Sequence, residues 1–142
     1  MGEIEIIYPK VEEKPARVLS VAEQKKLTAY LSTDADRCKL GVLLSLWTGL
    51  RIGELCALRG KDISLCDETI HIEATIQRIR RPRSENGLAS KTSVVIGPPK
   101  SKASIRLIPL TKSMLELYRK MLPLQDDEFI LSGTVHYLEP RA

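Results

Sequence analysis

The spacing of apolar residues changes along the chain, and this change constrains the fold more than any other feature. Between residues 36 and 47, leucines and a tryptophan recur at i, i+3, i+4 and i+7, which places them on one face of a helix. Between residues 69 and 77, isoleucine or alanine alternates with polar residues, which is typical of a strand with one buried side. The sequence therefore combines helices with strands.

The predicted elements give an α+β fold that is mainly helical with a small three-stranded antiparallel sheet. Ser20 and Glu23 form a capping box at the start of the first helix, and Gly49 is a C-cap glycine at the end of the second. Proline, glycine and asparagine separate the strands, so we expect turns between them. Helices are expected at 20–31, 36–47, 50–58 and 111–122, strands at 69–77, 94–96 and 104–108, and a short strand or turn at 129–131.

One domain is expected from 142 residues, since a domain takes roughly 100–200. Residues 1–16 are charged and broken by Pro9 and Pro15, which indicates a linker or arm, and the domain is expected to cover 17–142. No apolar run approaches the roughly 20 residues that span a bilayer, and the first residues lack the pattern of a secretion signal. We expect no association with membranes and a location in the cytoplasm.

Several kinds of chemistry lack the residues that they need. Two histidines 65 positions apart and three scattered cysteines match no metal-ligand spacing, and we expect the cysteines to be reduced. Neither GxxxxGK[ST] nor GxGxxG is present, so no nucleotide phosphate loop is predicted. An aromatic content of 4% argues against stacking of single-stranded bases. We expect neither a metal nor a cofactor.

The positive charge is concentrated in one segment. Residues 78–112 contain nine lysines and arginines and one glutamate, whereas the rest of the chain is acidic on balance. Such a segment attracts a polyanion, although a solvated, variable loop is the alternative interpretation. An exposed loop is predicted at 78–92, and its candidate DNA-binding residues are Arg78, Arg80, Arg81, Arg83 and Lys91.

Two motifs give the chain a family resemblance. The first is TGLRIGEL at 48–55, followed by ALRGKD at 57–62 and the strand at 69–77; the second is PKSKASIRLIPL at 99–110. Together and in this order they resemble the motif blocks of tyrosine recombinases, the phage-integrase family, in the style of conjugative-transposon integrases. The resemblance covers residues 17–142. It implies part of a tyrosine-recombinase catalytic domain that acts on double-stranded DNA with other recombinase protomers.

The resemblance also assigns roles to residues. Arg51 matches the first catalytic arginine, which in this family binds the scissile phosphate, and Glu54 matches a supporting carboxylate at i, i+3. Lys100 matches the catalytic lysine on a hairpin turn, which helps to protonate the leaving 5′-hydroxyl. Lys102 is the alternative, because insertions in the turn leave the alignment uncertain by two residues. The alternative interpretation, which does not use the resemblance, is that Arg51 and Glu54 form a surface ion pair and that Lys100 is a solvated turn residue.

The chain also departs from the family pattern. The family has a later His-x-x-Arg block and a nucleophilic tyrosine, but His136 is followed three residues later by Glu139. No tyrosine has the required context, and Tyr30 and Tyr118 are expected to be core or boundary residues of amphipathic helices. We therefore expect an incomplete catalytic domain, inactive alone, of a bacterial or phage protein that recombines DNA at the nucleoid through a 3′-phosphotyrosine.

Three other functions are compatible with the sequence. The first is a non-catalytic duplex-DNA-binding module or decoy that holds DNA with residues 78–112. The second is a type IB topoisomerase, which shares the arginine and lysine chemistry but not the spacing of the two motifs. The third is a protein-interaction fold with a solvated basic loop.

Overall fold

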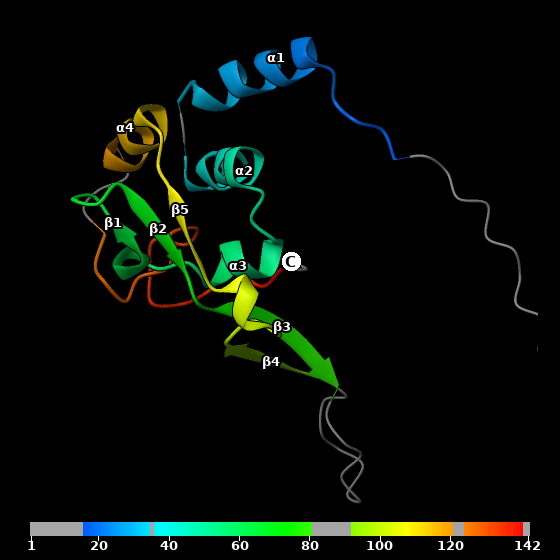
Figure 1. The fold of residues 1–142 in the computed structure, drawn as a ribbon, viewed down its shortest axis with the longest axis vertical. Helices are drawn as coiled ribbons and strands as arrows, with labels where there is room; N and C mark the ends of the chain where they lie inside the picture. Colours follow the sequence, from blue (N-terminus) through cyan, green and yellow to red (C-terminus); the bar gives the residue numbers. More distant parts are fainter. Residues whose placement is uncertain (1–15, 35, 81–91, 121–123, 141–142) are drawn as a thin grey trace, which may run out of the picture.

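The structure is a computed structural model, and it describes residues 16–34, 36–80, 92–120 and 124–140 (Figure 1). It confirms the α+β class. In chain order the elements are α1 Val21–Ser32, α2 Arg37–Thr48, α3 Ile52–Ala57, the 3-10 turn η1 Gly60–Asp62, β1 Ile63–Ser64, β2 Thr69–Ile72, β3 Thr75–Arg80, β4 Thr92–Gly97, the 3-10 turn η2 Lys102–Ser104, β5 Arg106–Pro109 and α4 Lys112–Lys120.

The predicted helix caps are present. Glu23 donates its backbone N–H to the Ser20 hydroxyl, and its carboxylate accepts from the Ser20 backbone N–H at 2.9 Å. Gly49 ends α2 with φ at +66°, the left-handed conformation that glycine adopts most easily. These local signals explain why the predicted helix ends lie within a few residues of the observed ones.

The strands form two small antiparallel sheets, which differs from the predicted arrangement. The strand predicted at 69–77 divides after Ile72 into β2 and β3, which pair with β5 and β4, respectively. Residues 92–109 therefore run antiparallel beside residues 69–80. The pairing is interrupted at 98–105, between β4 and β5, and at Glu73 and Ala74, between β2 and β3. A three-stranded sheet exists, but its order is β1-β2-β5. Figure 1 shows the β3–β4 pair beside α3 and extending away from α1, α2 and α4.

Two hydrophobic clusters explain this division of the long strand. Ile70 and Ile72 of β2 are buried in the main core, which α2, α4 and the three-stranded sheet share. Ile76 of β3 belongs to a second cluster with Cys56, Ala57 and Phe129. Because α3 contributes Leu55 to the first cluster and Cys56 and Ala57 to the second, both clusters fix the position of α3.

The structure tests other side-chain predictions. Trp47 packs against the main core, and Tyr118 is buried within it, as predicted. Tyr30 is 67% exposed with the Lys39 ammonium 5.0 Å from its ring centroid, so its prediction as a core or boundary residue was wrong. Helical periodicity correctly placed Tyr30 on α1, but its ring does not join the main hydrophobic core.

The loop predicted at 78–92 is wrong at both of its ends. Residues 78–80 continue β3 and Thr92 begins β4, because these residues pair across the two strands. Residues 81–91, with Arg81, Arg83 and Lys91, lie outside the described residues, as does most of the predicted 1–16 arm. Among the residues with described structure, no helix is long and apolar enough to cross a membrane.

Candidate active site

Arg51 occupies the turn between α2 and α3. Its backbone is extended, and it is the N-cap residue of α3. A cation at a helix start opposes the helix dipole, so the helix itself does not favour arginine at this position. The Arg51 backbone N–H donates to the Glu54 carboxylate at 3.1 Å, while 74% of the Arg51 side chain is exposed. The guanidinium is therefore presented to solvent by a residue whose backbone is hydrogen-bonded to Glu54.

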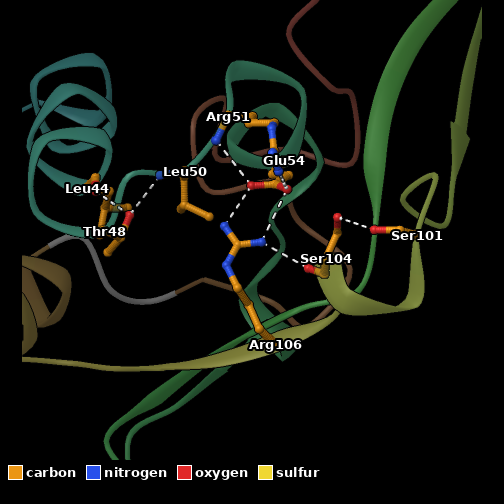
Figure 2. Close-up of polar contacts among 8 residues, drawn as sticks. All are labelled: Leu44, Thr48, Leu50, Arg51, Glu54, Ser101, Ser104 and Arg106. Carbon is orange, nitrogen blue, oxygen red and sulfur yellow. Dashed lines mark hydrogen bonds and ion pairs between the residues drawn. The ribbon is translucent and has the colours of Figure 1, made fainter.

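Glu54 is the centre of a bridge between two arginines (Figure 2). Its side chain is only 3% exposed. Arg106 of β5 donates to both carboxylate oxygens, Nη1 to Oε1 at 3.2 Å and Nη2 to Oε2 at 2.9 Å, and Arg51 Nη1 donates to Oε1 at 3.3 Å. Such two-point pairs of arginine and carboxylate are among the stronger hydrogen-bonded contacts in proteins.

The charges of this bridge follow from its geometry. The hydrogen bonds from Arg106 lower the pKa of Glu54, although burial of the carboxyl acts in the opposite direction. The hydrogen bond to Glu54 in turn raises the pKa of Arg106. Both groups are therefore ionised at neutral pH. Two guanidinium groups share one carboxylate, so the bridge keeps one net positive charge, and its exposed member is Arg51.

Sequence reasoning did not identify Arg106 as a site residue. The alternation along β5 turns Arg106 and Ile108 toward the protein, whereas Leu107 is 66% exposed. The sequence contains a signal for Arg106, because alternate residues of a strand lie on the same face. Arg106, Ile108 and the buried Leu110 are spaced two residues apart, which predicts that Arg106 lies on the buried face of the strand. That spacing predicts the side of the strand but not the partner, because Glu54 lies 52 positions earlier.

Lys100 lies in the interruption between β4 and β5, and it is exposed. The predicted position on a hairpin turn is therefore wrong, because the β3–β4 hairpin turns between Arg80 and Thr92 instead. Lys102 begins η2 in the same interruption. The geometry of this interruption does not distinguish the two lysines as the catalytic one.

Arg106 connects this interruption to α3. Ser104 donates its backbone N–H to the Ser101 carbonyl at 3.0 Å, and the two serine hydroxyls are 3.0 Å apart. Arg106 Nη1 also donates to the Ser104 carbonyl at 2.9 Å (Figure 2). One guanidinium thus contacts both Glu54, which orients Arg51, and the segment that carries the candidate lysines.

The remaining predicted residues lie on the β3–β4 pair or outside the described residues. Arg78 and Arg80 are exposed on β3. Arg78 Nη1 donates to the Thr92 hydroxyl at 2.9 Å, and Nη2 pairs with the Glu139 carboxylate. Within the described ranges, no group of three or more histidine, cysteine, aspartate or glutamate side chains is placed to hold a metal ion.

A curated protein aligns with most of this chain. It is described as a tyrosine recombinase XerC-like protein of Caldanaerobacter subterraneus subsp. tengcongensis, and it is 29% identical over 124 residues, which are 87% of this chain. The chain is therefore similar, over most of its length, to a protein described as a tyrosine recombinase. It spans about a third of that relative, 31% of its length. No family model matches the chain.

Solved structures confirm that the tyrosine-recombinase resemblance extends to the fold. A structure of the Tn1549 transposon integrase with transposon right end DNA matches 78% of this chain and 32% of the integrase chain, with a TM-score of 0.58 and 21% identity. A second structure of that integrase, with circular intermediate DNA, matches 89% of this chain and 38% of its own, with a TM-score of 0.60 and 20% identity. The fold thus resembles part of an integrase catalytic domain.

Proposed function

We propose that this chain is the part of a tyrosine recombinase that binds duplex DNA and holds the scissile phosphate with Arg51. The observation that supports the proposal is the bridge from Arg51 through the buried Glu54 to Arg106. A surface ion pair does not need a second arginine beneath it. Two arginines on one carboxylate instead leave the exposed guanidinium oriented and with its charge available to an anion.

The proposed chemistry follows from the charge that develops on a phosphodiester during strand cleavage. Attack on phosphorus increases the negative charge on the non-bridging oxygens, and an oriented guanidinium stabilises that charge. Arg51 supplies this guanidinium, and Glu54 is its positioning residue. Lys100, or alternatively Lys102, would donate a proton to the leaving 5′-oxygen, which then departs as a 5′-hydroxyl. The contacts of Arg106 to Glu54 and to the Ser104 carbonyl support a fixed spacing between these two functions.

The parent protein would cleave and rejoin DNA through a 3′-phosphotyrosine, together with other protomers and without a metal or nucleotide. This chain contains no His-x-x-Arg block and no tyrosine in the matching context. We therefore expect the chain by itself to bind duplex DNA without cleaving it, because covalent catalysis requires the nucleophile.

Duplex binding and covalent capture test the proposal. The chain is titrated with a fluorescent duplex over a range of salt concentrations and is incubated with a nicked suicide duplex. We expect affinity to fall steeply with salt, no covalent complex, and weaker binding for Arg51→Gln than for the charge-retaining control Arg51→Lys. Absence of salt-dependent duplex binding would refute the proposal. Binding that Arg51→Gln leaves unchanged would instead favour a non-catalytic module that holds DNA with its basic segment.

The basic segment has its own test. Replacing Arg80, Arg81 and Arg83 with serine should lower both the affinity and the salt dependence, by a slope of about 0.9 for each phosphate contact that is lost. Unchanged DNA binding by this variant would favour the protein-interaction alternative for the segment.

A further inference from the structure

A groove of about 280 Å³ lies between α3, β3 and the segment that ends at Pro140. Ile52, next to Arg51 in the chain, lines it from the helix, and Arg78 lines it from the strand. Gly53 allows helix and strand to approach closely, because a Cβ atom there would lie 2.6 Å from the Ile76 carbonyl oxygen. The lining of the groove thus includes the residue next to Arg51 in the chain and an arginine of β3.

Arg78 is positioned on the groove side of β3. It lies two residues after Ile76, which is buried against α3, so the two side chains share one face of the strand. One edge of its guanidinium donates to Thr92 of β4. The other edge is paired with Glu139, 61 residues further along the chain, and both side chains are about a third exposed.

Glu139 reaches Arg78 because the chain before it is held against the protein. The Tyr137 ring makes an edge contact with the buried Phe129, with ring centroids 6.1 Å apart and an interplanar angle of 74°. The Ser132 hydroxyl donates to the His136 carbonyl within the same turn. These contacts hold the Glu139 carboxylate against Arg78 of the basic segment, although the two residues are far apart in the sequence.

We propose that the groove is part of the DNA surface, that Arg78 binds a backbone phosphate there, and that Glu139 occupies the position of that phosphate until DNA displaces it. The proposal rests on the proposed function, since duplex DNA is the partner. A carboxylate and a phosphate oxygen pair present the same acceptor geometry to a guanidinium. An ion pair that solvent reaches is weak, so a polyanionic DNA backbone, with one negative charge on each phosphate, can displace Glu139.

Removal of the Glu139 charge tests the competition. We compare duplex affinity across salt concentrations for the unmodified chain, Glu139→Gln, Arg78→Gln and the double variant. Glu116→Gln is the matched control, because it removes one exposed carboxylate from α4. We expect Glu139→Gln to tighten binding by about two- to fivefold, the size of an exposed ion pair, and Glu116→Gln to change it less.

Two further results distinguish competition from a general effect of charge. The gain from Glu139→Gln should disappear in the Arg78→Gln background. The dependence of log K on log salt should steepen by up to about 0.9 in Glu139→Gln. The phosphate contact of Arg78 releases a cation from the DNA, and in the unmodified chain the displaced Glu139 carboxylate attracts a cation in return, which offsets that release. Equal effects of Glu139→Gln and Glu116→Gln would overturn the competition and leave the proposed function standing. Absence of duplex binding by all variants would overturn both.

Discussion

Replacement of Arg106 with leucine tests the bridge that supports the candidate site. The variant removes two hydrogen bonds, at 3.2 and 2.9 Å, from a carboxylate that is 3% exposed. Glu54 then retains its two contacts with Arg51, at 3.1 and 3.3 Å. Loss of one partner from a fully buried pair costs about 3–5 kcal/mol. Because 31% of the Arg106 side chain is exposed, we expect the free energy of unfolding to fall by about 2 kcal/mol.

Urea unfolding followed by the fluorescence of Trp47, the single tryptophan, measures this loss. Arg119→Leu on the exposed side of α4 is the control, and we expect a change below about 0.5 kcal/mol for it. Glu54→Gln combined with Arg106→Leu should cost less than the sum of the single variants, since the two residues share one interaction. A loss below about 0.5 kcal/mol for Arg106→Leu would refute the bridge as a stabilising contact.

The same variant predicts a pH dependence. Hydrogen bonds from Arg106 are the main reason that the pKa of Glu54 is lowered in the folded state. A lowered carboxyl pKa stabilises the fold above the unfolded pKa, and this contribution is lost as pH falls through the folded pKa. Burial raises the pKa of Asp62, which acts in the opposite direction but is common to both proteins. The stability difference between the unmodified chain and Arg106→Leu should therefore shrink on acidification; a constant difference would contradict this assignment.

Two further predictions concern α3. Gly53→Ala should lower the free energy of unfolding, measured in urea, by about 1–3 kcal/mol, because the added Cβ meets the Ile76 carbonyl oxygen. Gly97→Ala is the control, because a Cβ atom there meets no atom within 4 Å. Equal effects of the two substitutions would disprove the close approach of α3 to β3. Cys56 is 2% exposed and burial raises its pKa, so a thiol reagent should label the other two cysteines, both exposed, first, and Cys56 only after denaturation; three equally fast thiols would contradict its burial.

The parts of the site that sequence reasoning found are those with local causes. Arg51 and Glu54 are three residues apart at the start of a helix, so their spacing alone predicts that they meet. The cap at Gly49 similarly depends on neighbouring residues only. Arg106 and Glu139 contact residues 52 and 61 positions away, and those contacts depend on strand pairing and chain return, which no periodicity encodes.

The strands show the same limit. Alternation located residues 69–77 as a strand, because it reports which side chains are buried. It does not report that Ile72 and Ile76 are buried in different clusters, and that difference divides the strand at Glu73 and Ala74. Tyr30 was misplaced for a related reason, since a periodic face predicts burial only where another element covers it.

The interrupted return strand has a consequence for insertions and deletions. Lys100 and Lys102 lie in the segment 98–105 between β4 and β5. The pairing of β4 with β3 fixes one end of this segment, and the pairing of β5 with β2 and the contact of Arg106 with Ser104 fix the other. The spacing of the two lysines from Arg51 therefore does not depend on how many residues join Arg80 to Thr92. A tag or a foreign loop inserted between those two residues should change the length of the basic segment but not the spacing of Lys100 and Lys102 from Arg51. The length of the segment and the geometry of the candidate site can therefore be engineered separately.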